Sequence, residues 1–214
     1  KGRLGTIYAS IIHKGYVYLG TNQGLFYRKE EDKTAFNFVE GTKGQIWCLR
    51  VLNDELFCGH DSGTFIIKDG TQQKIGNALG TWDIKKVPKK KNIFIQGNYD
   101  GLYIFKKENN VWRISHKLKD FNISSKHFEW VSPSKILMNH EYKGVYELTI
   151  SDDYQSVTAF KKNESVQKSA NSSLIQFDNT IYQANKNGIF GYDATSATFH
   201  KDSILSTMFQ NNEY

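Results

Sequence analysis

The sequence predicts an all-β fold, a β-propeller of about five four-stranded blades. Three observations lead to this prediction. A strand–turn–strand pattern recurs along the chain, each copy holds a glycine followed two residues later by an aromatic side chain, and turn residues interrupt the apolar runs about every 8 to 12 residues. The pattern fits a complete ring as well as a segment of a larger propeller.

The recurring pattern is clearest in the segment YLGTNQGLFYR, residues 18–28. Two bulky residues lead into Gly-Thr, two polar residues follow, and a glycine then opens a second apolar run. Four more copies follow at steps of 39, 38, 43 and 44 residues, and about 40 residues suit one four-stranded blade. The anchor glycines of the five copies are Gly24, Gly63, Gly101, Gly144 and Gly188.

Each anchor glycine has informative neighbours. The anchor closes a polar hairpin turn, where glycine reaches positive φ without steric cost. The aromatic residue two positions later is expected to pack one blade on the next; these residues are Phe26, Phe65, Tyr103, Tyr146 and Phe190. The residue four positions before the anchor is small in four copies, which indicates crowding, and His140 departs from the rule; the residues are Gly20, Gly59, Gly97, His140 and Ala184.

We expect residues 1–214 to form a single propeller domain or propeller segment. The predicted units are about 5–43, 44–79, 80–123, 124–168 and 169–210. In the first unit the turn Lys14-Gly15 follows the apolar run TIYASIIH, and the polar break EEDK precedes the outer strand. The strands expected in the first two units are 6–13, 16–21, 24–29 and 35–39, then 45–52, 55–60 and 64–68, with a weak fourth strand before Gly80.

The same rules place the strands of the remaining units. They are expected at 81–87, 92–98, 102–107 and 111–116, then 127–131, 135–140, 145–150 and 156–160, then 172–177, 180–185, 189–192 and 198–200. The first strands of units one to three open alike, with Gly5-Thr-Ile-Tyr8, Gly44-Gln-Ile-Trp47 and Gly80-Thr-Trp82.

Composition agrees with one folded all-β body. Of the 214 residues, 39% are apolar and 14% aromatic, and two prolines and no low-complexity tract argue against a long linker. No run approaches the roughly 18 apolar residues of a membrane helix, and no signal peptide precedes the first strand. The chain lacks an initial Met and stops at residues 211–214, where a further unit would begin, so we expect a piece of a longer protein.

The net charge is +6, and the lysines are scattered apart from one run, Lys85-Lys86 and Pro88-Lys89-Lys90-Lys91. A nucleic-acid binder would concentrate basic residues on one face beside aromatic partners. We therefore expect no direct nucleic-acid binding by this segment. The run is interpreted as a solvated hairpin turn, with a contact to a phosphate or an anionic surface as the alternative.

The two cysteines, Cys48 and Cys58, fall on strands that should be adjacent and antiparallel. Close approach of the two side chains is compatible with this register. Buried free thiols are favoured because a cross-strand disulfide is geometrically demanding. A disulfide is the alternative for an exported protein.

The candidate ligand site is a ring of polar residues three positions before each anchor. In a propeller these strand ends gather on one face around the central channel, where ligands often bind. The alternative is that each side chain caps its own hairpin turn through backbone hydrogen bonds. The ring residues are Thr21, His60, Asn98, Glu141 and Asn185.

No catalytic residue, metal site or cofactor is predicted. His60 and His140 each adjoin a carboxylate, but neighbouring residues on a strand point to opposite faces and the spacing is not that of a metal site. A glycan-cleaving enzyme would need two carboxylates around the channel. The proposed ring holds one, Glu141, so the enzyme hypothesis ranks last.

The segment from Tyr18 to Arg28, together with GQIW at 44–47, resembles the two-component regulator propeller repeat. The first unit fits nearly throughout. The second and third keep the frame, with His60 and Asn98 in place of Thr21, while the fourth and fifth keep the anchor glycine and the aromatic. The resemblance extends over nearly the whole chain.

In that family such repeats form the extracytoplasmic sensor part of bacterial regulators. The resemblance implies a non-enzymatic sensor segment facing the periplasm, often homodimeric, that relays binding to an output domain outside this chain. Its partner would be a small molecule, carbohydrate-derived in several members, or a protein. Membrane attachment would come only through regions outside this chain. A free-standing protein-interaction scaffold is the alternative function.

Overall fold

A computed structural model describes residues 4–209. Residues 1–3 and 210–214 lie outside the described part, and with them lie the expected end of the fifth unit at residue 210 and the segment where a further unit was expected. The chain divides into two compact units, Lys1–His116 and Lys117–Tyr214. The division of the chain into propeller units at the boundaries given above stays a prediction.

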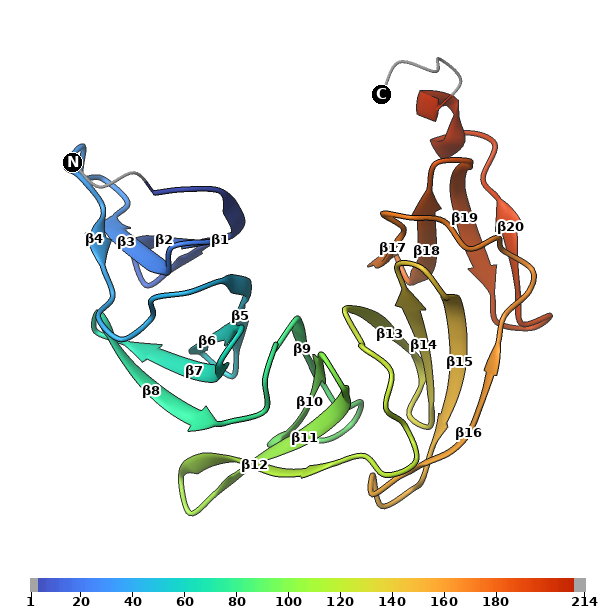
Figure 1. The fold of residues 1–214 in the computed structure, drawn as a ribbon, viewed down its shortest axis with the longest axis horizontal. Helices are drawn as coiled ribbons and strands as arrows, with labels where there is room; N and C mark the ends of the chain where they lie inside the picture. Colours follow the sequence, from blue (N-terminus) through green and yellow to red (C-terminus); the bar gives the residue numbers. More distant parts are fainter. Residues whose placement is uncertain (1–3, 210–214) are drawn as a thin grey trace. The chain divides into compact units, whose positions relative to one another are not determined.

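The first compact unit holds three four-stranded sheets (Figure 1). The first sheet consists of β1 (Ile7–His13), β2 (Tyr16–Thr21), β3 (Leu25–Lys29) and β4 (Asn37–Phe38). The second consists of β5 (Ile46–Leu52), β6 (Glu55–His60), β7 (Gly63–Lys68) and β8 (Thr71–Gly76). The third consists of β9 (Asp83–Lys86), β10 (Ile93–Asn98), β11 (Gly101–Glu108) and β12 (Val111–Lys117).

The second compact unit holds two four-stranded sheets and a short helix. The fourth sheet consists of β13 (His127–Ser132), β14 (Lys135–His140), β15 (Gly144–Ile150) and β16 (Val157–Lys162). The fifth consists of β17 (Ser173–Phe177), β18 (Thr180–Asn185), β19 (Gly188–Asp193) and β20 (Thr198–Lys201). The 3-10 helix η1 (Leu205–Phe209) packs beside β19.

In every sheet the strands pair antiparallel in chain order, as a meander. The all-β prediction, with about five four-stranded blades, is therefore confirmed. No helix among residues 4–209 is long and apolar enough to cross a membrane. The lysine run lies in and after β9, where Lys85 pairs with Asp83 at 3.2 Å and Lys89 to Lys91 are exposed.

Strand β4 is shorter than expected, two residues instead of five. At the end of β4 the N–H of Val39 still donates to Leu25 O at 2.9 Å, in register with the pair Phe26 and Phe38. The N–H of Leu25 donates instead to the Thr42 hydroxyl at 3.1 Å, so the ladder ends there.

The five anchor glycines all have positive φ, between 95° and 145°. Four of them close a hairpin with two residues in the turn; His60 pairs with Gly63, for example, and Asn185 with Gly188. The fourth hairpin differs because His140 pairs with Gly144 across a turn of three residues. Because of this extra residue, the position four before the anchor, His140, is equivalent to His60 and not to the small residue Gly59. The strands themselves are not distorted.

The small residues before the turns allow the following sheet to approach. A Cβ on Gly20 would lie 2.5 Å from Ile46 of β5, and one on Gly59 would lie 2.4 Å from the backbone oxygen of Thr81. In the fourth sheet the equivalent residue is Asn139, which pairs with Val145. Its buried amide donates to the backbone oxygen of Ser172 at 3.0 Å, so a hydrogen bond replaces close packing there.

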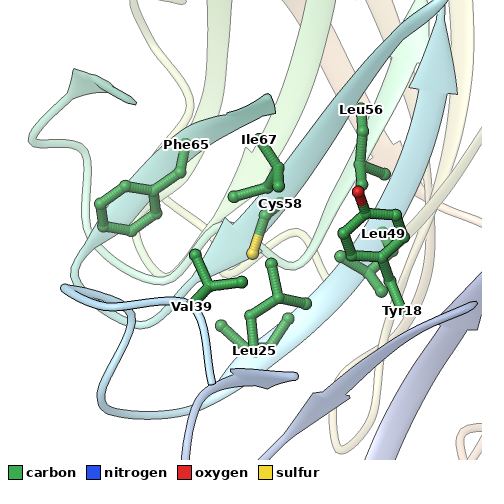
Figure 2. Packing of buried hydrophobic residues seen from close by; sticks show 9 residues of the cluster. Tyr18, Leu25, Val39, Leu49, Leu56, Cys58, Phe65 and Ile67 are labelled. Atoms are coloured by element: carbon green, nitrogen blue, oxygen red, sulfur yellow. The ribbon is translucent and has the colours of Figure 1, made fainter. Parts of the chain in front are cut away.

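Apolar residues between neighbouring sheets form the cores. Between the first and second sheets Leu25 and Val39 meet Cys58 and Phe65 (Figure 2). Between the second and third sheets Phe57 lies among aromatic rings. Each core forms because alternate residues on both faces of a blade are apolar, as sheets packed on both sides require.

A third cluster joins the fourth and fifth sheets in the second compact unit. Leu137 and Val145 of the fourth sheet lie with Ile181 and Phe199 of the fifth. Phe190, one of the repeated aromatics, packs against this cluster.

Four of the five repeated aromatics divide into two kinds, and the hydroxyl of the fifth, Tyr103, donates to the Asp100 carboxylate at 3.0 Å. Phe65, like Phe190, lies in the packing between two sheets. Phe26 and Tyr146 instead contact the outer strand of their own sheet, through Phe38 at 5.2 Å and Phe160 at 6.3 Å between ring centroids.

Both cysteines are free and buried. Cys48 lies opposite Gly59, while Cys58 lies opposite Leu49, so the two thiols project from opposite faces of the second sheet. The free-thiol prediction is confirmed. Burial raises the pKa of Cys48 to about 12 and also raises that of Cys58.

We expect neither thiol to react with iodoacetamide while the protein is folded, because the thiolate is the nucleophile and both thiols are buried and protonated. In urea both should be alkylated. Mass spectrometry of the native and unfolded protein checks this. Rapid alkylation of the native protein, or an intact disulfide before reduction, would contradict it.

Candidate functional site

Three of the predicted ring residues cap their own hairpin turns. The Thr21 hydroxyl, the His60 Nδ1 atom and the Asn185 Oδ1 atom each accept the backbone N–H two residues ahead, at 3.0, 2.9 and 2.7 Å. All three side chains are buried, at most 5% exposed. The capping alternative therefore accounts for these residues.

Asn98 belongs to a buried hydrogen-bond network between the second and third sheets. Its amide donates to the backbone oxygens of Ala78 and Leu79 at 3.1 and 3.0 Å. Its Oδ1 atom accepts from Gln96 at 2.9 Å, and Gln96 in turn accepts from the Thr64 hydroxyl at 2.8 Å. Asn98, fully buried, is thus engaged in holding two sheets together.

The fourth ring position needs a correction. Because the fourth turn is one residue longer, the equivalent of His60 is His140 and not Glu141. The hydrogen bonds agree, since Nδ1 of His140 accepts the N–H of Tyr142 at 3.2 Å, as in the capped turns. Glu141 stands in the turn, partly exposed, and forms an ion pair with Lys126.

The five positions fall in the two compact units, Thr21, His60 and Asn98 in the first and Glu141 and Asn185 in the second. A ligand ring formed by all five stays a prediction. Among residues 4–209, no group of three or more His, Cys, Asp and Glu side chains is arranged to hold a metal ion.

The histidines of the turns are held neutral. Burial lowers the pKa of His60 from 6.5, and the adjacent Asp61 carboxylate opposes this shift in part. Burial also lowers the pKa of His140, with the Lys143 ammonium acting in the same direction. A neutral ring suits Nδ1 as an acceptor of a backbone N–H.

The free energy of unfolding should therefore decrease as the pH is lowered into the acid range. The unfolded chain binds protons at these histidines as pH falls through about 6.5, whereas the folded protein takes them up only at lower pH, so the free energy of unfolding decreases between those pKa values. The substitution His60→Asn keeps a capping acceptor, as at Asn185, and should make the decrease between pH 7 and 5 smaller. Urea unfolding at several pH values measures both; identical pH profiles would contradict the prediction.

A row of aromatic side chains in the first compact unit lies at the starts of the inner strands and in the turn between β10 and β11. We call Tyr8, Trp47, Trp82 and Tyr99 the aromatic shelf. Ring centroids are 5.3 Å apart between Tyr8 and Trp47, 4.5 Å between Trp47 and Trp82, and 5.1 Å between Trp82 and Tyr99. Tyr8 is 45% exposed and Tyr99 40% exposed. Solvent therefore reaches a continuous run of rings over three blades.

Strand irregularities place two of these rings, those of Tyr8 and Trp47. The register shifts between Ile7 and Ala9, and between Ile46 and Cys48, so that Tyr8 and Trp47 are the extra residues of β-bulges. A bulge re-aims the side chain of its unpaired residue and is common beside functional sites. Strand β1 packs beside β5 and β5 beside β9, which brings the three ring-bearing segments together.

A glycine beside the shelf allows two of its parts to come into contact. Gly80 has a φ of 68°, and a Cβ there would lie 2.1 Å from the ring of Tyr99. Tyr99 thus lies directly on the backbone that leads into Trp82. The Trp47 indole N–H donates to the Tyr99 hydroxyl at 3.0 Å, which fixes the relative positions of two rings from different blades.

The shelf is confined to the first three sheets. Trp47 stands directly before Cys48, the strand residue that pairs with Gly59. The residues in the same place along the chain are Lys126, before His127 in the fourth sheet, and Ser172, before Ser173 in the fifth. Lys126 pairs with Glu141, and Ser172 is buried against Asn139. The signal for the shelf in the sequence is the shared opening of the first three units. It did not predict a binding surface, because strand alternation alone does not reveal the bulges that place these side chains.

Comparison with known proteins shows the fold. No protein-family model matches the sequence, and no curated protein matches it. Among solved structures, the extracellular domain of BT4673 from B. thetaiotaomicron, described as a one-component system, is 13% identical with a TM-score of 0.67 over 92% of this chain. The extracellular domain of BT3049 from the same organism, described as a hybrid two-component system, is 11% identical with a TM-score of 0.67, again over 92% of this chain.

The WD40 propeller domain of Doa1 is 10% identical, with a TM-score of 0.57 over 96% of this chain and 85% of its own length. This chain spans only 28% of the BT4673 domain and 30% of the BT3049 domain. The propeller fold implied by the resemblance to the two-component regulator repeat is confirmed. Extracellular domains of bacterial regulatory systems and a WD40 domain share it, so the fold alone does not choose between a sensor and a scaffold.

Proposed function

We propose that this chain is a non-enzymatic, ligand-binding propeller segment of an extracytoplasmic sensor, and that the aromatic shelf is its binding surface. The observation that carries the proposal is the run of partly exposed rings from Tyr8 to Tyr99 over three blades. Large exposed aromatic groups with a polar edge are typical of binding surfaces. The solved extracellular domains of regulatory systems support the sensor role.

The proposed ligand is a carbohydrate. Flat rings present apolar faces against which the C–H face of a sugar can lie, while the Tyr99 hydroxyl and the polar turn residues offer hydrogen bonds. Ligand binding would be relayed to an output domain outside this chain, with a homodimer as the proposed assembly. Location outside the cytoplasm is part of the same proposal.

A panel of soluble oligosaccharides, tested by thermal unfolding, examines this function. A ligand that binds only the folded protein stabilises it by about 2.7 kcal/mol at a hundredfold excess over its dissociation constant. We expect at least one saccharide to raise the melting temperature of the natural protein and of Phe36→Ala, which removes a partly buried aromatic stacked on Arg28 at 4.6 Å outside the shelf. No shift anywhere in the panel would overturn the carbohydrate proposal.

A protein partner is the second candidate, and the same residues favour it. Trp and Tyr are enriched among the residues that dominate protein–protein binding energy. Stoichiometric capture of a protein by the natural chain and its loss in Trp47→Ala, without stabilisation by any saccharide, would identify an interaction scaffold.

A further inference from the structure

A cavity of about 510 Å³ lies between the first and second sheets. It lies at the ends of β1 and β5 opposite to the aromatic shelf, beside the turns that follow those strands. Its volume is within the roughly 300–1,000 Å³ range of small-molecule sites. The shelf and this cavity are therefore separate features of the same compact unit.

Three tyrosines of the first sheet form one wall. The ring centroids of Tyr16, Tyr18 and Tyr27 are 6.0 to 6.4 Å apart, and Tyr18 and Tyr27 are stacked with an interplanar angle of 23°. Leu56 and Ile67 of the second sheet lie across from them. The cavity thus combines an aromatic wall with an apolar one.

The hydroxyl of Tyr18 is a polar group between the aromatic wall and the apolar one. The side chain is 5% exposed, and no described residue forms a hydrogen bond with its hydroxyl. Figure 2 shows the hydroxyl end of the ring pointing toward Leu56, which also lines the cavity. The hydroxyl is not among the side-chain atoms that are fully buried without a hydrogen-bond partner, so it is open to solvent or a ligand in the cavity. Burial raises the pKa of Tyr18, so the group that faces the cavity is a protonated donor.

The cavity is lined by three lysines and three carboxylates, and four of these six side chains form two ion pairs. Lys14 pairs with Asp54 at 2.9 Å, and Lys107 pairs with Glu55 at 2.8 Å. One ammonium, Lys68, and one carboxylate, Asp69, also line the cavity. Neither forms an ion pair with any residue in the described part of the chain. The cavity therefore offers one group of each sign.

We propose that this cavity binds a small zwitterion, a free amino acid or short peptide with an apolar side chain. The ligand ammonium would face Asp69 and the ligand carboxylate Lys68, with a carboxylate or peptide oxygen accepting from the Tyr18 hydroxyl. The side chain would lie against Leu56 and Ile67. A ligand of net positive or negative charge would pair with only one of these two exposed side chains and repel the other, so a zwitterion matches the cavity best.

Calorimetric titration of the full chain with leucine and with leucyl-leucine tests this assignment. N-acetyl-leucinamide, which has the same side chain and no charge, is the matched control ligand. We expect the zwitterions to bind and the capped compound to bind at least tenfold more weakly, because the capped compound has no charge to pair with Asp69 or Lys68. Equal binding of capped and uncapped compounds, or no binding of either zwitterion at millimolar concentration, would overturn the proposal.

Three variants locate the site. Asp69→Asn retains a residue that tolerates the positive φ of 49° at this turn, and Lys68→Gln changes an exposed side chain, so both should fold. Each should weaken zwitterion binding roughly tenfold, and Tyr18→Phe about fivefold. Trp47→Ala should leave this binding unchanged, which separates the cavity from the shelf. Unchanged affinity in both charge variants would contradict the assignment even if Tyr18→Phe fails to fold.

Discussion

Replacing Phe57 by alanine should lower the free energy of unfolding by about 3–5 kcal/mol. Phe57 is fully buried in β6 and meets three rings of the third sheet, Phe94, Phe105 and Trp112, at 5.3 to 5.8 Å between centroids. Truncation removes these contacts and leaves a cavity between two blades that rigid neighbouring strands cannot close. Urea unfolding monitored by tryptophan fluorescence measures the loss.

The matched control is Phe177→Ala, because Phe177 is 68% exposed. Its removal should change the free energy of unfolding by about 0.5 kcal/mol or less. A loss below about 1 kcal/mol for Phe57→Ala, or equal losses for the two variants, would contradict the packing described for the second and third sheets.

Replacing Asn98 by alanine should cost about 2–4 kcal/mol of stability. The substitution removes two bonds to the backbone oxygens of Ala78 and Leu79. It also removes the 2.9 Å bond from the buried amide of Gln96, which keeps only a longer one, 3.4 Å, to the Thr81 hydroxyl. Each buried polar group that loses its partner costs about 1–3 kcal/mol, and connected groups lose more together than singly. Denaturant unfolding measures this loss as well.

This prediction also separates two roles for Asn98. If its side chain served only to contact a ligand, alanine would leave the stability of the free protein unchanged. Asn92→Ala is the control, because Asn92 is exposed and its side chain has no hydrogen bond in the described structure. A loss for Asn98→Ala no larger than for Asn92→Ala would favour the ligand role.

The sequence was sufficient to predict the fold because the repeat unit recurs in it. Anchor glycines such as Gly63, with a φ of 145°, stand where a tight hairpin requires positive φ, and the spacing between copies corresponds to one sheet. The fourth hairpin shows where counting from the anchor fails. One inserted residue shifts the equivalent position from Glu141 to His140, and only the strand register reveals it.

The candidate site was harder to predict because polar residues at equivalent positions have different partners. Thr21 and Asn185 cap turns. Asn98 instead joins a network with Gln96 from its own strand and Thr64 from the preceding sheet. The aromatic shelf depends on bulges at Tyr8 and Trp47, which re-aim side chains that simple alternation would assign to a sheet face. Register and bulges arise from pairing between strands, which a single strand's sequence does not encode.

The most direct test of the shelf as binding surface is the affinity of the best saccharide from the panel for the natural protein, Trp47→Ala and Trp82→Ala, measured by calorimetry. Both tryptophans are partly exposed, so both variants should remain folded, which their melting temperatures without ligand will show. Each substitution should weaken binding at least tenfold, in line with the energies of central aromatic residues at binding surfaces. Unchanged affinity in both folded variants would contradict the shelf as the ligand site.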